Sequence, residues 1–119
     1  MTSTASQYGT GPVSINLSDP ALATYGTNAR TILGSIAALW AGDVSGDGIL
    51  SYTNAGNDRD PILVRVGGSV PTATTNGYYP EDVNLDGVVR YTNAGNDRDP
   101  ILVNIGGAVP TNTRTEQLP

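Results

Sequence analysis

The hydrophobic pattern of this chain changes near residue 40. Before that point, PVSINLS alternates apolar and polar residues at Val13, Ile15 and Leu17, which predicts a half-buried strand. The next stretch, NARTILGSIAALWAG, contains Gly34 and several β-branched residues, which weaken a helix. It allows either a partly helical segment or a second strand near residues 36–40, and the sequence leaves both alternatives open.

After residue 40, two short apolar runs stand between helix start and stop signals. The first run, PILVRV, follows Asp60 and ends at Gly67-Gly68, and the second, PILVNI, lies 39 residues later. Asp at the N-cap, Pro61 at the first helical position and glycine at the end are typical of a helix. The pattern predicts two helices of about two turns, because these flanking residues outweigh the β-branched character of the runs. The apolar residues of the first, Ile62, Leu63 and Val66, are expected to face the other copy.

These helices belong to two internal repeats. Residues 43–74 and 82–113 align at an offset of 39 with 23 identities in 32 positions, and YTNAGNDRDPILV is identical in both. A solenoid generally needs at least three repeats, so two copies predict a pair packed about a pseudo-twofold axis. The expected fold class is small α+β, with two loop–helix units preceded by a β-strand segment.

The pattern divides the chain into four parts. Residues 1–12 are interpreted as a linker or a segment introduced by cloning, 13–38 as a strand-containing segment, 39–113 as the duplicated module and 114–119 as an irregular polar tail. The first residues lack the basic and apolar regions of a signal peptide, so any export signal would lie upstream in a longer protein. No stretch is long and apolar enough for a transmembrane helix, and membrane insertion is not expected.

The composition limits which metal sites, binding partners and enzymatic activities the sequence allows. The net charge is −5, and eight of the nine Asp residues lie within the repeats. Clustered acids repel one another unless a cation is present, and the lack of a basic patch argues against nucleic-acid binding. The chain has no Cys and no His, which excludes disulfides and makes zinc, copper and iron sites unexpected. An enzyme is not expected either, because the sequence has no serine elbow and no glycine-rich phosphate loop.

The acidic residues follow the spacing of an EF-hand-type calcium loop. DVSGDGI (43–49) opens the first loop and DVNLDGV (82–88) opens the second. In such a loop, positions 1, 3 and 5 supply side-chain oxygens, glycine at position 6 allows a sharp turn, and position 7 supplies a backbone carbonyl. Leu50 and Val89, at position 8, are expected to join the two loops through a short β contact. The predicted ligands are Asp43, Ser45, Asp47 and Ile49 in the first loop and Asp82, Asn84, Asp86 and Val88 in the second.

The end of each loop departs from the EF-hand pattern. Position 12 is normally an acid, but here it is Asn54 or Asn93. We interpret TNAG as a four-residue insertion, after which Asp58 and Asp97 close the two loops. Asp60 and Asp99 are the competing candidates for this closing role, but the predicted N-cap role already explains them. Asn54 and Asn93 could add further oxygen ligands.

The two sites are not expected to be equal. Ser45 is a poorer oxygen donor at position 3 than Asn84, and Gly46 is more flexible than Leu85. The second site is therefore expected to bind calcium at least as tightly as the first.

Together these features resemble the duplicated F-hand calcium repeats of dockerins. They resemble still more closely dockerin-like C-terminal modules of large secreted or surface proteins from Bacteroidetes, which carry GDVNGDG…NDRDPIL and end near EQLP. The resemblance covers roughly residues 39–119. It implies an extracellular or cell-surface module that binds two Ca²⁺ ions at the end of an adhesin-like or enzyme-bearing protein. The ligands it implies are Asp43, Ser45, Asp47 and Asp58, with Asp82, Asn84, Asp86 and Asp97.

Several functions are compatible with this sequence. The leading hypothesis is a non-catalytic, calcium-stabilised module. The alternative is a recognition module that binds a cohesin-like partner domain, which solvent-facing helix residues matched between the copies would favour. Two hypotheses rank lower. One is a carbohydrate-binding adhesin tip built on Trp40, Tyr78 and Tyr79, which are expected instead to cap the core. The other is calcium-dependent self-cleavage at the Asp-Pro bonds, which the helix starts explain without chemistry.

Overall fold

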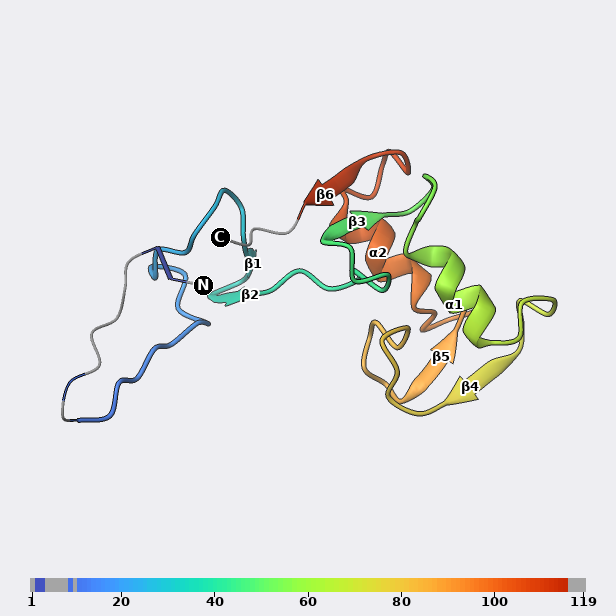
Figure 1. Cartoon of the computed structure of the whole chain (residues 1–119), viewed down its shortest axis with the longest axis horizontal. Coiled ribbons are helices and arrows are strands. Elements are labelled where there is room, and N and C mark those ends of the chain that lie inside the picture. Colours follow the sequence, from blue (N-terminus) through green and yellow to red (C-terminus); the bar gives the residue numbers. More distant parts are fainter. Residues whose placement is uncertain (1, 4–8, 10, 116–119) are drawn as a thin grey trace. The chain divides into compact units, whose positions relative to one another are not determined.

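The computed structural model describes residues 2–3, 9 and 11–115 (Figure 1). These residues form two α-helices and six three-residue strands, with every strand pair antiparallel. The expected α+β class is confirmed at this level. The chain divides into two compact units between Trp40 and Ala41. Neither helix in the described residues is long and apolar enough to cross a membrane.

In the first unit, β1 (Thr31–Leu33) and β2 (Ile36–Ala38) form a hairpin in which Ile32 pairs with Ala37. Gly34, with a φ of 64°, begins the two-residue turn in a conformation that residues with a Cβ rarely adopt. The strand alternative is therefore correct for this stretch, and the partly helical one is wrong.

The strand predicted from Val13, Ile15 and Leu17 is wrong. This stretch has no regular structure, and the three side chains are 42–50% exposed. Alternation supplies an apolar face, but a strand also needs a neighbour for its backbone N–H and C=O groups. Asn16 instead accepts hydrogen bonds from the N–H and the hydroxyl of Ser18, at 3.1 and 2.7 Å, and this local turn competes with strand pairing.

In the second unit, the helices α1 (Arg59–Arg65) and α2 (Arg98–Asn104) contain the predicted Asp-Pro sequences. They end as predicted, because the Gly68 N–H donates to the Leu63 carbonyl at 2.8 Å, and Gly107 makes the equivalent bond in the second repeat. The short apolar runs therefore form helices rather than strands.

The helix starts differ from the prediction, because Asp60 and Asp99 lie in the first turn and not at the N-cap. Asp58 takes the N-cap position but makes no side-chain cap bond. The capping bonds come from Asn57, whose Oδ1 accepts from the Asp60 N–H and whose Nδ2 donates to the Asp60 carboxylate, both at 2.9 Å. Asn96 makes the same pair of bonds in the second repeat. An amide can accept and donate at once, so this reciprocal cap displaces the simpler Asp cap.

The strands of the second unit pair across the repeats. In the first loop, β3 (Ile49–Ser51) pairs with β6 (Thr113–Thr115), which follows α2. In the second loop, β5 (Val88–Arg90) pairs with β4 (Thr74–Asn76), which follows α1. The two registers are equivalent under the 39-residue offset of the repeats, since position 49 faces 115 and position 88 faces 76.

This pairing corrects two expectations. Leu50 and Val89 do not join the loops to each other, because their strands pair with β6 and β4 instead. Both side chains are fully buried, and each loop strand packs on the helix of the other repeat. Each loop strand therefore lies beside the segment that follows the helix it packs on, and it pairs with that segment. Residues 114 and 115, expected to be irregular, therefore belong to β6. The rest of the predicted tail, 116–119, lies outside the described residues.

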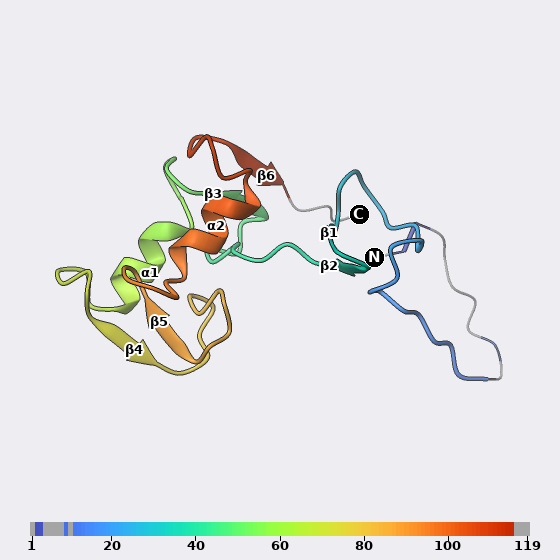
Figure 2. The same cartoon turned by 180° about the vertical axis from the view of Figure 1, so that it is seen from behind.

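The core of the second unit lies where the helices meet. In both views, α1 and α2 lie side by side between the two strand pairs (Figures 1 and 2). Ile62, Val66, Val89 and Ile101 are buried together, and Leu63 is half-buried against them. The expectation that the apolar helix residues face the other copy is confirmed. This small aliphatic core positions the two loops.

Candidate metal-binding loops

The carboxylate of Asp43 holds the first loop. Its Oδ1 accepts hydrogen bonds from the N–H groups of Gly46 and Asp47 at 2.8 and 3.2 Å, and its Oδ2 accepts from Gly48 at 2.9 Å. Gly46 and Gly48 have φ values of 73° and 82°, which would strain a residue with a side chain. The chain therefore turns sharply around its first acidic residue, at the predicted glycine.

Asp58 joins the end of the first loop to its beginning. Its Oδ1 accepts from the N–H groups of Val44 and Ser45 at 2.9 and 3.0 Å, and its Oδ2 accepts from Ser51 at 2.8 Å. The residue is 0% exposed. Asp60 is exposed and bonds within the helix start. Of the two competing residues, Asp58 is thus the one that contacts the loop.

The second loop repeats this arrangement. Asp82 is buried and accepts from the N–H groups of Asp86 and Gly87 at 3.1 and 2.9 Å. Asp97 is 0% exposed and accepts from Asn84 and Arg90 at 3.3 and 2.8 Å. In both repeats, the first and the closing Asp of the predicted ligand set therefore bind the same loop backbone.

Asp97 is a buried acid without an ion-pair partner among the described residues. Burial raises its pKa, and the carboxylate of Asp82 raises it further, although the backbone N–H groups of Arg90, Asn84 and Val83 lower it. Because the net shift is upward, the hydrogen bonds do not fully compensate for desolvation of the charge. A cation nearby would favour the ionised form.

Four other predicted ligands also make hydrogen bonds within their own loops. Asp47 accepts from the Ile49 N–H and Asp86 from the Val88 N–H, both at 2.8 Å. The carbonyls of Asn54 and Asn93 accept from the side-chain amides of Asn57 and Asn96, at 2.9 and 2.8 Å. In the part of the chain that the structure describes, no three Asp, Glu, His or Cys side chains converge as a metal cluster. The predicted residues thus surround two loops, with carboxylates turned to N–H groups rather than gathered on one point.

Sequence reasoning misses two residues at position 9 of the loops. Ser51 is 5% exposed, and its buried hydroxyl lacks a hydrogen-bond partner in the described structure. Arg90, the equivalent residue, forms an ion pair with Asp86 at 2.5 Å. The available signal is that this position differs between two otherwise similar loops, and that position 9 of an EF-hand often contacts the ion through water.

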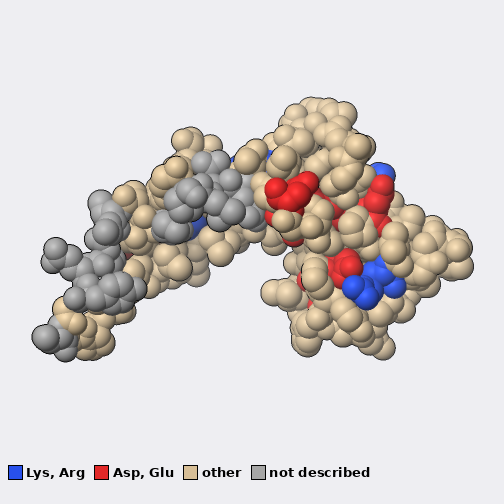
Figure 3. Space-filling view, in the orientation of Figure 1, with Lys and Arg blue, Asp and Glu red and all other residues tan. Residues whose placement is uncertain are grey.

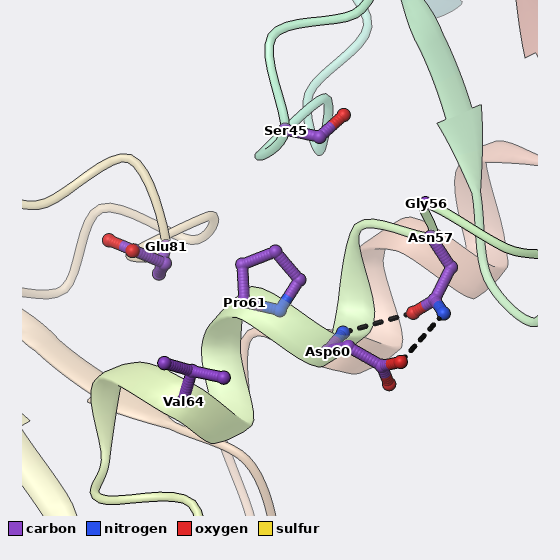
Figure 4. A pocket seen from close by; sticks show the side chains of 7 residues that line it. All are labelled: Ser45, Gly56, Asn57, Asp60, Pro61, Val64 and Glu81. Atoms are coloured by element: carbon purple, nitrogen blue, oxygen red, sulfur yellow. Dashed lines mark hydrogen bonds between the residues drawn. The ribbon is translucent and has the colours of Figure 1, made fainter.

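A pocket of about 440 Å³ opens beside the first loop (Figure 4). Its volume is in the range of small-ligand pockets and is far larger than one ion needs. In the space-filling view, atoms of Asp and Glu residues gather on the visible face of the same unit, next to atoms of arginine residues (Figure 3). The pocket is lined by Ser45, Gly56, Asn57, Asp60, Pro61, Val64 and Glu81.

Three aromatic residues, Trp40, Tyr78 and Tyr79, do not cap the core as expected. Tyr78 is 77% exposed, and its ring lies against Gly87, 3.5 Å from where a Cβ would stand. The ring of Tyr79 is covered by the guanidinium of Arg65, 4.4 Å from the ring centroid. Trp40 belongs to the first unit, where its Nε1 donates to the Asn28 carbonyl at 2.8 Å. Glycine at position 87 leaves room for the Tyr78 ring beside the loop.

Comparison of the chain with known protein families, with curated proteins and with solved structures finds no match. The likeness to dockerin repeats therefore rests on the loop and repeat motifs.

Proposed function

We propose that residues 41–115 form a non-catalytic, calcium-stabilised module of a larger extracellular protein, either adhesin-like or enzyme-bearing. One observation carries the proposal. Asp58 and Asp97 are both 0% exposed, and among residues 11–115 neither forms an ion pair. A buried carboxylate without a positive partner is costly, even when it is hydrogen-bonded. Calcium at each loop would neutralise this charge and add its binding free energy to folding.

The donor set suits calcium. The loops offer oxygen atoms only, which hard cations such as Ca²⁺ prefer over the nitrogen and sulfur ligands of transition metals. Glycine at position 6 keeps the turn, and the reciprocal strand pairing supports two pseudo-twofold-related units. In this structure the carboxylates accept hydrogen bonds from backbone N–H groups, so calcium binding would require them to converge. The first ion would be held by Asp43, Ser45, Asp47, Ile49 and Asp58, and the second by Asp82, Asn84, Asp86, Val88 and Asp97.

Thermal unfolding in excess EDTA and in millimolar calcium tests this proposal. A ligand that binds only the folded state at about 100 times its Kd adds about 2.7 kcal/mol per site. In a domain of this size, 1 kcal/mol raises Tm by about 4–8 °C, so each site should raise it by roughly 10–20 °C. Magnesium at the same concentration should raise it less, because Mg²⁺ keeps more of its water. A Tm that is the same in EDTA and calcium would refute the proposal.

Binding of a cohesin-like protein domain is the second candidate function. Val64 and Val103 occupy equivalent positions on α1 and α2 and are 73% and 68% exposed. Matched solvent-facing apolar residues have no role in the core, and the pocket of Figure 4 includes Val64. Titration of cohesin-type domains into the calcium-loaded chain tests this function, with a Val64→Glu, Val103→Glu double variant as the control. Binding that the double variant leaves unchanged would count against these two faces.

A further inference from the structure

The two loops carry different groups beside their position-5 carboxylates. In the second loop, Arg90 Nη1 lies 2.5 Å from Asp86 Oδ2 and 3.4 Å from the Val88 carbonyl. In the first loop, position 9 is Ser51, and Asp47 has no ion pair among residues 11–115. The second loop therefore contains its own positive charge at a predicted calcium ligand, and the first does not.

The four-residue insertion of the second repeat, residues 92–95, lies close to this ion pair. A Cβ on Gly95 would lie 3.8 Å from Asp86 Oδ2 and 4.0 Å from Arg90 Nη1, so Gly95 faces both charges across a short gap. Asn84 Nδ2 donates to the Gly95 carbonyl at 2.8 Å, which ties the insertion to loop position 3. The equivalent glycine of the first repeat, Gly56, has no neighbour within 4 Å of a Cβ in the described structure. The first insertion thus leaves its loop more open.

We propose that Arg90 is a tethered counter-cation that lowers the calcium affinity of the second loop. This inference rests on the proposed calcium function. Before Asp86 Oδ2 can ligate calcium it must leave the guanidinium, and the guanidinium then stands beside a divalent cation of the same sign. The first loop has neither cost, so it binds calcium more tightly. This order is the reverse of the one expected from Ser45 and Asn84.

Calorimetry on single-site variants tests the role of Arg90. Asp43→Ala disables the first loop, so calcium binding to this variant reports on the second. In that background, Arg90→Gln keeps the length of the side chain and removes its charge, and it should tighten the calcium Kd by about tenfold, or about 1.4 kcal/mol. An unchanged or weaker Kd would overturn the inference. The control is Arg90→Gln in the Asp82→Ala background, where the Kd of the first loop should not change.

A second measurement needs only the intact two-loop chain. In EDTA, Arg90→Gln should lower Tm, because the Asp86 carboxylate loses its partner. In calcium, the rise in Tm should be larger than for the unsubstituted chain. A residue with only a structural role would lower Tm equally in both conditions, and that result would overturn the inference. The converse variant, Ser51→Arg in the Asp82→Ala background, should weaken calcium binding by the first loop.

The outcomes separate this inference from the proposed function. If calorimetry finds no calcium binding to any variant, the calcium function fails and the role of Arg90 fails with it. If calcium binds both loops and Arg90→Gln leaves the second Kd unchanged, only the role of Arg90 fails.

Discussion

Replacing Asp58 by Asn tests which acidic residue closes the first loop. The Asp58 carboxylate accepts three backbone N–H bonds, two on Oδ1 from Val44 and Ser45 and one on Oδ2 from Ser51. An Asn side chain keeps one oxygen and turns its amide toward the other donors, so at least one buried N–H loses its acceptor. Such a loss costs about 1–3 kcal/mol, and each kcal/mol lowers Tm by about 4–8 °C.

The matched control is Asp60→Asn. The side chain of Asp60 is 60% exposed, and an Asn there can still accept from the Asn57 amide. Its cost should stay within about 0.5 kcal/mol. The assay is urea unfolding followed by far-UV circular dichroism, in EDTA and in millimolar calcium. Asp58→Asn should lose more stability in calcium than in EDTA, because it also loses a ligand. The assignment of Asp58 is refuted if Asp60→Asn costs as much in both conditions.

Three further substitutions test the core, a close approach and the buried acid. Ile101→Ala, at a fully buried position, should cost about 2–5 kcal/mol in urea unfolding, whereas Val103→Ala on the same helix should cost no more than about 0.5 kcal/mol; equal costs would contradict the core assignment. Gly42→Ala places a Cβ 2.9 Å from Ile101 Cγ1 at a φ of 115°, which should cost about 1–3 kcal/mol, and a melt identical to that of the unsubstituted chain would disprove the clash. Because burial raises the folded pKa of Asp97 above its unfolded value of about 3.9, this group adds stability at low pH that is lost as pH rises through the folded pKa. In EDTA, the unsubstituted chain should therefore lose stability relative to Asp97→Asn as the pH rises above about 4, and parallel pH curves would contradict the shift.

The sequence predicts those parts of the second unit that depend on local signals. Both helices and their glycine ends follow from residues within a few positions of each other, such as Asp60-Pro61 and Gly67-Gly68. The sharp turn at Gly48 is local for the same reason, since a left-handed φ favours glycine. The position of Asp58 against the loop is predicted by its spacing from Asp43 once the TNAG insertion is allowed for.

The remaining features depend on residues far apart in sequence. Three-residue strands such as β4 and β6 are too short to show a period, and the sequence does not indicate that β3 pairs with a segment of the other repeat. The Asn57 cap competes with an equally plausible Asp cap, and only the three-dimensional helix start decides between them. When the two repeats are aligned, Arg90 looks like a surface substitution for Ser51. Its contact with Asp86 forms only when the second loop folds.

Because each loop strand pairs with a segment of the other repeat, the two loops gain their strand partners at different times during synthesis. When the second loop leaves the ribosome, the partner of β5 has already been made, because β4 precedes it by about a dozen residues. The first loop must wait until residue 113 has emerged, about 60 residues after Ser51, before β3 gains its neighbour. A nick or truncation that removes β6 would for the same reason damage the first loop and leave the β4–β5 pair in place. The integrity of the first loop thus depends on a strand that is translated about 60 residues after it.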